Sequence, residues 1–288
     1  MKDEATGTLW VEKGRLRFRY DTHWLEQSGV MALSQSLPLQ IEVFDDQVCR
    51  PFFAGLLPEG DLRRCGEPGS RGSRARASRG GMANSNAADH AAQDKLLVVV
   101  EGQRIGLPKG NAASTHILKP AIAAVDNSVT NEAFCMALAR MVKLRAADTQ
   151  ILMAGDQRIL LVRRYDRRRA NDGSWSRLHQ EDFCQALAVP PDLKYQNEEG
   201  PDLQACFSLL RRATRPSAPE VIRLLDAVIF NALIGNHDAH AKNFSILYRK
   251  QATTLAPLYD LLCTAVYPTL TAPLGAIRQG SRVVRSSG

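Results

Sequence analysis

The sequence lacks the features that would place the chain in a membrane or outside the cell. No apolar run reaches the roughly 18 residues of a membrane-spanning helix. The first residues, Met-Lys-Asp-Glu-Ala, contain no apolar stretch of the signal-peptide kind. The six cysteines are scattered and form no C-x-x-C pair. We therefore expect a cytoplasmic chain with reduced thiols.

Aromatic residues are also scarce, at 6% of the chain, but hydrophobic residues reach 44% and are sufficient for a packed core. The 288 residues are enough for two modest domains. The net charge of +7 is weak evidence for a nucleic-acid partner, because much of it lies in one unusual segment.

That segment, 63–95, contains no Leu, Ile, Val, Phe, Tyr or Trp, and its arginines alternate with Gly, Ser and Ala. Such a composition cannot bury enough apolar surface to offset the entropy of ordering. The segment is either a basic arm for DNA or RNA or a disordered linker, and its composition favours the linker.

Polar residues are concentrated after an apolar helix that begins near Ser217. The pattern Ser-x-x-Glu, with Pro219 in the first turn, predicts a capping box between Ser217 and Glu220. Apolar residues then cover most faces of the helix, so we expect it to be buried and to end at Gly235. The polar residues that follow predict a functional site, because buried polar groups need partners.

Within this loop, Asp238 and Asn243 have the D-x-x-x-x-N spacing of a protein-kinase catalytic loop. In that arrangement the Asp accepts the proton of the substrate hydroxyl and the Asn holds a magnesium ion. Lys242 could neutralise a transferring phosphate. Asp260 supplies a second carboxylate, so Asn243 and Asp260 together could hold Mg²⁺.

A metal-dependent hydrolase is an alternative reading of the same loop. His237, Asp238 and His240 are all metal-ligand types within four residues. One loop rarely supplies a whole metal site, however, and no H-E-x-x-H spacing is present.

Several motifs resemble the HipA family of serine/threonine kinases, the toxins of HipBA-type toxin–antitoxin pairs. The longest is Gly-Asn-His-Asp-Ala-His-Ala-Lys-Asn-Phe-Ser at 235–245, followed by Leu-Ala-Pro-Leu-Tyr-Asp at 255–260. Shorter matches lie at 52–60, 115–120, 181–187 and 194–195. The resemblance covers roughly 1–61 and 92–271.

The resemblance implies a phosphate-binding loop that includes Ala92, Gln93 and Lys95. Ala91 stands where the family has a glycine, which lets backbone N–H groups approach phosphates closely. Ala88 stands where family members carry a serine that they can autophosphorylate. We therefore expect poor phosphate positioning and no regulation by that route.

The resemblance also assigns the rest of an ATP site. Lys119, at the end of a strand, would contact the phosphates, whereas a lone strand lysine is usually a solvated edge residue. The backbone of Arg163 to Tyr165 would bind adenine as the hinge. The set is completed by His240, Lys242, Asn243, Tyr259 and Asp260.

A helix capped by Thr130 is expected to continue to about Leu144, with Phe134, Leu138, Met141 and Val142 facing inward. Glu132 in this helix could form the kinase ion pair with Lys119, or it could simply complement the helix dipole. The sequence does not decide between the two roles.

These observations predict an α+β fold, namely a two-lobed, protein-kinase-like body preceded by a small β-rich subdomain. The expected boundaries are an N-terminal subdomain (1–61), a basic divergent linker (62–91), a kinase body (92–271) and a divergent tail (272–288). The body is expected to lack C-terminal helices that its relatives have, which would leave apolar surface exposed.

The expected function is ATP- and Mg²⁺-dependent phosphorylation of a protein serine or threonine, impaired by the altered phosphate loop. The resemblance implies a translation component such as glutamyl-tRNA synthetase as substrate. It also implies a HipB-like DNA-binding antitoxin as partner, with DNA reached only through that antitoxin. The alternative is an inactive relic that only binds an antitoxin or DNA.

Overall fold

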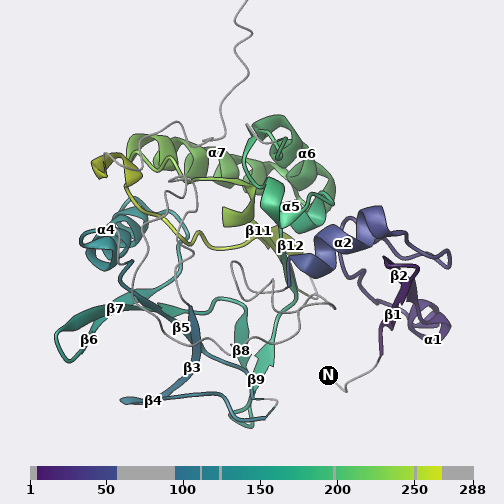
Figure 1. The fold of residues 1–288 in the computed structure, drawn as a ribbon, viewed down its shortest axis with the longest axis horizontal. Coiled ribbons are helices and arrows are strands. Elements are labelled where there is room, and N and C mark those ends of the chain that lie inside the picture. The colour runs from purple at the N-terminus through teal and green to yellow at the C-terminus, as the bar shows by residue number, and fades with distance from the viewer. Residues whose placement is uncertain are drawn as a thin grey trace, which may run out of the picture.

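The computed structural model describes residues 5–56, 95–110, 112–122, 125–196, 199–249 and 252–267. The linker and tail expected at 62–91 and 272–288 lie outside these residues. Figure 1 shows three parts: a small N-terminal subdomain in purple, a lobe built on a curved sheet in teal, and a helical lobe in green and yellow.

The N-terminal subdomain packs a β-hairpin against a helix. Its elements are β1 (Gly7–Glu12), β2 (Arg15–Tyr20), α1 (Thr22–Glu26) and α2 (Asp46–Ala54). The strands pair antiparallel, and Phe18 and Tyr20 on β2 enter a small aromatic core with Phe44 and Phe52. Asp45 caps α2 through its side chain.

Residues 38–43 of this subdomain alternate between apolar and polar types, a pattern that predicts a strand, but they do not form one. Ile41 is 75% exposed, and the backbone hydrogen bonds with the hairpin begin at Phe44, which exchanges two of them with Phe18. A period of two is therefore not sufficient for a strand, which also needs backbone pairing along its length.

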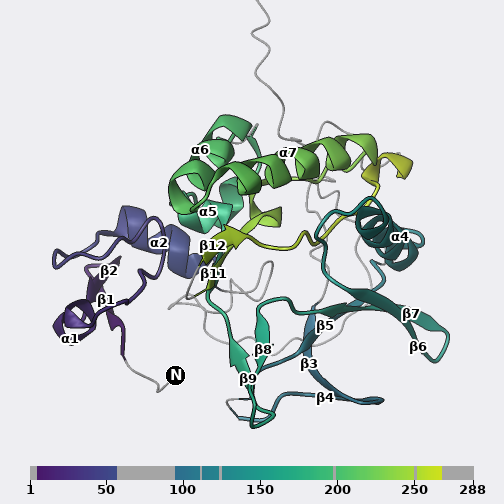
Figure 2. The ribbon, with the colours of Figure 1, turned by 180° about the vertical axis from the view of Figure 1, so that it is seen from behind.

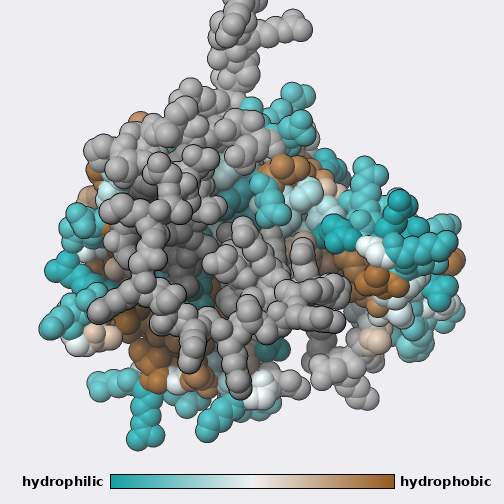
Figure 3. Space-filling view, viewed as in Figure 1, coloured by the Kyte–Doolittle hydropathy of each residue, from teal (hydrophilic) through white to brown (hydrophobic). Residues whose placement is uncertain are grey.

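The first lobe of the body is a five-stranded antiparallel sheet in the order β4-β3-β5-β7-β6. Its strands are β3 (Leu96–Glu101), β4 (Arg104–Gly106), β5 (His116–Pro120), β6 (Thr149–Ala154) and β7 (Gln157–Arg163). The apolar runs at 96–100 and 159–162 predict strands, and β3 and β7 confirm both predictions. Some apolar side chains of this lobe, such as Leu96 and Leu97, remain exposed, and brown surface lies over this part of the sheet in Figure 3.

Helix α4 (Ser128–Met141) packs on β6 and β7 with a different face from the one expected. Thr130 does not cap it, because the helix begins two residues earlier. Phe134, Met141 and Val142 are more than half exposed, and only Leu138 of the expected set packs against the core. The buried face carries Glu132 and the small residues Cys135 and Ala139, which allow close approach to the sheet.

The second lobe combines helices with a small antiparallel sheet in the order β10-β11-β12. Its elements are β10 (Gln180–Asp182), α5 (Phe183–Ala186), η1 (Pro191–Leu193), α6 (Leu203–Ala213), α7 (Ala218–Leu233), η3 (Ala241–Asn243), β11 (Ser245–Arg249), β12 (Ala252–Leu255) and η4 (Thr264–Val266). A hairpin of β8 (Arg167–Arg169) and β9 (Trp175–Arg177) lies between the lobes in the chain. Figure 2 shows α6 and α7 above the small sheet from behind.

Helix α7 departs from two expectations. Ser217 makes no capping hydrogen bond, and Glu220 instead accepts one from the Leu255 amide at 2.9 Å and pairs with Arg223. The predicted capping box is therefore wrong, because the Glu220 carboxylate is used to hold β12. The helix is also buried on one face only, since Ile222, Leu225, Ile229 and Leu233 are exposed.

Candidate active site

The loop 236–243, called the catalytic loop below, starts where α7 ends at Gly235, as predicted. Gly235 has a φ of +67°, and an added Cβ would lie 2.7 Å from the Ala265 side chain. Only glycine fits both the positive φ and the close approach. Asn236 then fixes the loop to the helix, because its side chain donates to Asn231 Oδ1 at 2.7 Å.

Asp238 is held by two hydrogen bonds. Its backbone N–H donates to Asn236 Oδ1 at 3.2 Å, and the Tyr195 hydroxyl donates to Asp238 Oδ1 at 2.7 Å. The Tyr195 ring also contacts His240 edge-to-face, with ring centroids 5.0 Å apart. The carboxylate is partly exposed, so it is oriented yet reachable from solvent.

Asn243 closes the catalytic loop onto His240. Its side-chain Oδ1 accepts from the His240 amide at 2.9 Å, and its own amide donates to the His240 carbonyl at 2.9 Å. This reciprocal pair forms the single turn η3 and fixes the amide side chain of Asn243.

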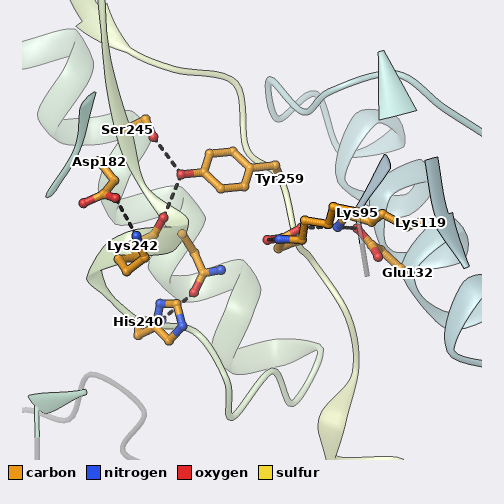
Figure 4. A network of polar contacts seen from close by, with 10 residues as sticks. Lys95, Lys119, Glu132, Asp182, His240, Lys242, Ser245 and Tyr259 are labelled. Carbon is orange, nitrogen blue, oxygen red and sulfur yellow. Dashed lines mark hydrogen bonds and ion pairs between the residues drawn. The ribbon is translucent and has the colours of Figure 1, made fainter. Parts of the chain in front are cut away.

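Lys242 points away from Asn243 toward Asp182, at the end of β10. Its Nζ lies 2.9 Å from Asp182 Oδ2, and both side chains are nearly buried. Figure 4 shows this pair beside Tyr259 and Ser245. The ammonium expected to neutralise a phosphate thus already has a carboxylate partner in this structure.

Tyr259 joins the catalytic loop to the segment that carries Asp260. Its hydroxyl donates to the Lys242 carbonyl at 2.7 Å and lies 2.7 Å from Ser245 Oγ (Figure 4). Its ring stacks on Tyr165, with centroids 6.0 Å apart. Burial raises the pKa of Tyr259 well above its ordinary value, so the hydroxyl stays neutral and acts as a donor.

Four charged residues, called the lysine cluster below, lie on the side of the sheet lobe. Lys119 Nζ is 2.6 Å from Glu132 Oε1 and also bonds Asp260 Oδ1. The second oxygen of Asp260 is 3.3 Å from Lys95 Nζ. These contacts join β5, α4, the start of β3 and the segment after β12 (Figure 4). Of the two roles open for Glu132, the structure shows the ion pair.

The lysine cluster keeps Asp260 and Lys119 charged. Burial alone would raise the pKa of Asp260, but the charges of Lys119 and Lys95 hold that pKa well below its usual range. Burial likewise opposes the charge on Lys119, yet Asp260 and Glu132 raise its pKa. Asp260 also has a φ of +55°, a conformation uncommon outside glycine. Asp260 is therefore an ionised carboxylate at neutral pH, held in a strained backbone.

The expected hinge has most of its amide groups engaged. The Arg163 N–H donates to the Asp148 carbonyl at 2.8 Å, and the Arg164 N–H donates to the Thr115 carbonyl at 3.0 Å. The Arg163 side chain is exposed. Backbone contacts to an adenine would thus have to come from the carbonyl groups of this segment or from Tyr165.

Most of the predicted residues fall into two groups, and Figure 4 shows His240, Lys242 and Tyr259 of the first group apart from Lys95 and Lys119 of the second. Asp238, His240, Lys242, Asn243 and Tyr259 are joined around the catalytic loop, and Lys95, Lys119 and Asp260 form the lysine cluster. Ala88, Ala91, Ala92 and Gln93 lie outside the described residues.

Sequence reasoning assigned no role to Tyr195, Asp182 or Asn236. Tyr195 and Asp182 belong to motifs at 181–187 and 194–195, but no spacing rule connects them to the catalytic loop, which lies far along the chain. Asn236 precedes Asp238 by two residues, and an Asn at that offset is a common loop anchor that could have been noticed.

The hydrolase alternative requires several metal-ligating side chains that lie close together. Among the residues that the structure describes, no three His, Cys, Asp or Glu side chains form a group that could hold a metal ion. The described helices also include none that is long and apolar enough to cross a membrane.

Two family models match the chain. The HipA N-terminal domain matches residues 1–71, and the HipA-like C-terminal domain matches residues 89–284. The chain belongs to the HipA family. The resemblance found in its motifs is thereby confirmed over both parts of the chain.

Relatives of this HipA-family chain include a Sinorhizobium fredii protein named "Putative kinase Y4mE", which is 40% identical over 94% of this chain and 77% of its own length. The "Serine/threonine-protein kinase toxin HipA" of Shewanella oneidensis is 31% identical over 61% of this chain and 42% of that protein. The family is therefore one of kinases and kinase toxins.

A solved structure confirms the fold. A chain from the Shewanella oneidensis complex of HipA, HipB and operator DNA superposes with a TM-score of 0.71, covering 92% of this chain and 75% of the other at 22% identity. The α+β, two-lobed kinase-like architecture expected for this HipA-family chain is thus correct.

Proposed function

We propose that this chain is an ATP- and Mg²⁺-dependent protein serine/threonine kinase of the HipA toxin type. The observation that carries the proposal is the position of Lys119, bonded to Glu132 and to Asp260. Carboxylates from two other elements, α4 and the segment after β12, converge on this ammonium group, and kinases pair their phosphate-binding lysine with a helix glutamate in the same way. No structural need explains this convergence, because burying three charges is expensive.

Asp238 is the proposed catalytic base. The hydrogen bond from Tyr195 fixes its carboxylate, and its partial exposure leaves room for a substrate hydroxyl. It would orient the serine or threonine and accept its proton as the phosphoryl group transfers. Since phosphoryl transfer needs mainly positioning and charge neutralisation, a rigid loop suits this chemistry.

The chemistry of two donor groups suits a magnesium ion. Asp260 offers an ionised carboxylate and Asn243 an amide oxygen, both of the hard oxygen type that Mg²⁺ prefers. A bound magnesium ion would neutralise charge on the ATP phosphates. For Asp260 to serve, Lys95 must release one of its oxygens, and the half-exposed Lys95 side chain allows this.

We also expect the activity to be weak, because Ala91 replaces the glycine of the phosphate loop. The second candidate function is therefore the inactive relic that only binds. The proposed partners are a HipB-like DNA-binding antitoxin, with DNA bound only through it, and a translation component such as glutamyl-tRNA synthetase. The family membership and the relative crystallised with HipB support the antitoxin.

The proposal is tested with wild type and Asp238→Asn. Wild type should transfer ³²P from ATP to a protein substrate only with Mg²⁺, and Asp238→Asn should reduce the rate by about 10²–10⁴-fold. ATP affinity should be equal in the two proteins, because Asp238 is not expected to hold the nucleotide. Nucleotide binding without any phosphotransfer in wild type would favour the relic. Full activity in Asp238→Asn would overturn the mechanism.

A further inference from the structure

The short strand β10 connects the N-terminal subdomain to the catalytic loop. It has three residues and pairs antiparallel with β11, which follows the catalytic loop directly. Successive side chains of a strand point to opposite faces. Glu181 and Asp182 therefore contact different parts of the molecule.

Glu181 faces the N-terminal subdomain and is 1% exposed. Its Oε1 accepts from the Gln35 amide at 3.0 Å and from the Tyr248 hydroxyl, and its Oε2 accepts from the Ser34 hydroxyl. The Gln35 side chain also donates to the Tyr248 hydroxyl at 3.0 Å. A buried carboxylate without these donors would be costly, so the contact is specific.

The segment 33–37 that supplies these donors is fixed within its own subdomain. The Tyr20 hydroxyl donates to the Leu37 carbonyl and accepts from the Leu33 amide at 2.8 Å. Ser36 Oγ donates to the Gln185 carbonyl at 2.9 Å, beside the Glu181 contact. The N-terminal subdomain thus presents a rigid loop, and the contact can transmit position.

Asp182 faces the other way. Its Oδ2 pairs with Lys242 of the catalytic loop at 2.9 Å, while its Oδ1 caps α5 at the Gln185 amide, also at 2.9 Å. The next residue, Phe183, donates to the Phe244 carbonyl at 3.0 Å. Asp182 therefore links the catalytic loop to β10, and the N-terminal subdomain contacts the opposite face of β10 through Glu181.

We propose that the N-terminal subdomain positions the catalytic loop through Ser34, Glu181, Asp182 and Lys242. Glu181 acts as a positioning residue and touches no reacting atom. With the subdomain docked, Lys242 is held beside Asp182, and the backbone between Asp238 and Asn243 is fixed. The catalytic consequence rests on the proposed kinase function, whereas the positional consequence does not.

The test is amide hydrogen exchange of full-length Ser34→Ala, with Ser36→Ala as the matched control. Both changes remove a hydroxyl from the same loop. Ser36 contacts Ser34 and the Gln185 carbonyl, but only Ser34 contacts Glu181. Ser34→Ala should speed exchange at 238–244 about tenfold, as loss of one hydrogen bond to a charged group implies. Ser36→Ala should leave these amides near the wild-type rate, and the amides of α6 serve as the reference for global unfolding.

Equal exchange at 238–244 in wild type and Ser34→Ala, or an equal increase in Ser36→Ala, would overturn the proposal. If Ser34→Ala also accelerates exchange in α6, the milder Gln35→Ala decides. It removes only the donor to Tyr248, so a local increase at 238–244 of about threefold supports the proposal and no increase overturns it.

Kinetics separate this inference from the proposed function. With an active wild type, Ser34→Ala should lower kcat about tenfold and leave the KM for ATP unchanged. In an Asp182→Asn background the same change should have no further effect, because the route through Asp182 is already broken. An additive effect would overturn the route. An inactive wild type would remove the proposed function and leave the exchange result to decide the inference.

Discussion

The lysine cluster and the catalytic loop are built in opposite ways. The cluster is held by ion pairs among side chains from four separate segments, and its geometry depends on which charges are present. The catalytic loop has one ion pair, between Lys242 and Asp182, and is otherwise held by hydrogen bonds of neutral groups, including Asn236, Tyr195 and the Tyr259 hydroxyl. The cluster can therefore rearrange when a charged ligand arrives, whereas the loop keeps its shape.

The largest effect is expected at Asp260, the residue of the lysine cluster that we propose as a magnesium ligand. Asp260→Ala should abolish Mg²⁺-dependent ATP binding, because the other carboxylate of the cluster, Glu132, is buried and paired with Lys119 and does not replace the lost ligand. Calorimetric titration of Mg²⁺·ATP measures this, with Asp238→Asn in the catalytic loop as the control that keeps its affinity. Equal affinities in Asp260→Ala and wild type would remove Asp260 from the site.

Glu132→Ala should destabilise the fold by about 3 kcal/mol, because it leaves the buried Lys119 with one carboxylate instead of two. Urea denaturation measures the change. Lys95→Ala is the control within the same cluster, and its half-exposed pair should cost under about 1 kcal/mol. Similar losses of unfolding free energy in the two variants would mean that burial does not determine how much each ion pair of the cluster stabilises the fold.

A smaller effect is expected for a substitution that touches the catalytic loop. Tyr195→Phe removes one hydrogen bond to Asp238 and keeps the ring contact with His240. We expect kcat to fall about tenfold, with little change in the KM for ATP. A steady-state assay checks this, and a change confined to the KM for ATP would contradict a role in orienting Asp238.

The smallest effect concerns pH. Burial raises the pKa of Glu181 despite its three hydrogen bonds, and nearby Asp182 adds to the shift. Since the folded state then binds the proton more tightly, the stabilising contribution is present below the ordinary value near 4.5 and is lost as pH rises through the raised pKa. The always neutral Glu181→Gln should therefore gain stability relative to wild type as pH rises.

Melting temperatures of both proteins from about pH 4 to pH 8 test this difference. A difference that is flat across the range would show that Glu181 titrates as it does in an unfolded chain. A difference that shrinks with rising pH would mean that the hydrogen bonds, and not burial, set its pKa.

The sequence predicted the parts of the site that lie in continuous motifs. The D-x-x-x-x-N spacing located Asp238 and Asn243 in one loop, and the apolar runs located β3 and β7 correctly. The turn at Gly235 was predictable because only glycine suits it. The family resemblance, and not periodicity, singled out Lys119 as a site residue.

The remaining features depend on tertiary contacts that no local pattern encodes. The inward face of α4 is set by the reach of Glu132 to Lys119, so counting apolar residues selected the wrong face. Glu220 has the spacing of a capping box, but the Leu255 amide, from a distant strand, takes its carboxylate. No sequence pattern points to Asp182 and Tyr195, because their partners follow α6 and α7 and are therefore far away in the sequence.

Glu181 and Asp182 point in opposite directions, and this limits which mutations the chain can accept. A point substitution in β10 removes one contact and leaves the other in place. Insertion or deletion of one residue just before the strand shifts its register and turns every side chain to the other face. Both acidic contacts would then fail at once, so changes of length between β9 and β10 are tolerable only where the added or lost residues bulge out of the strand.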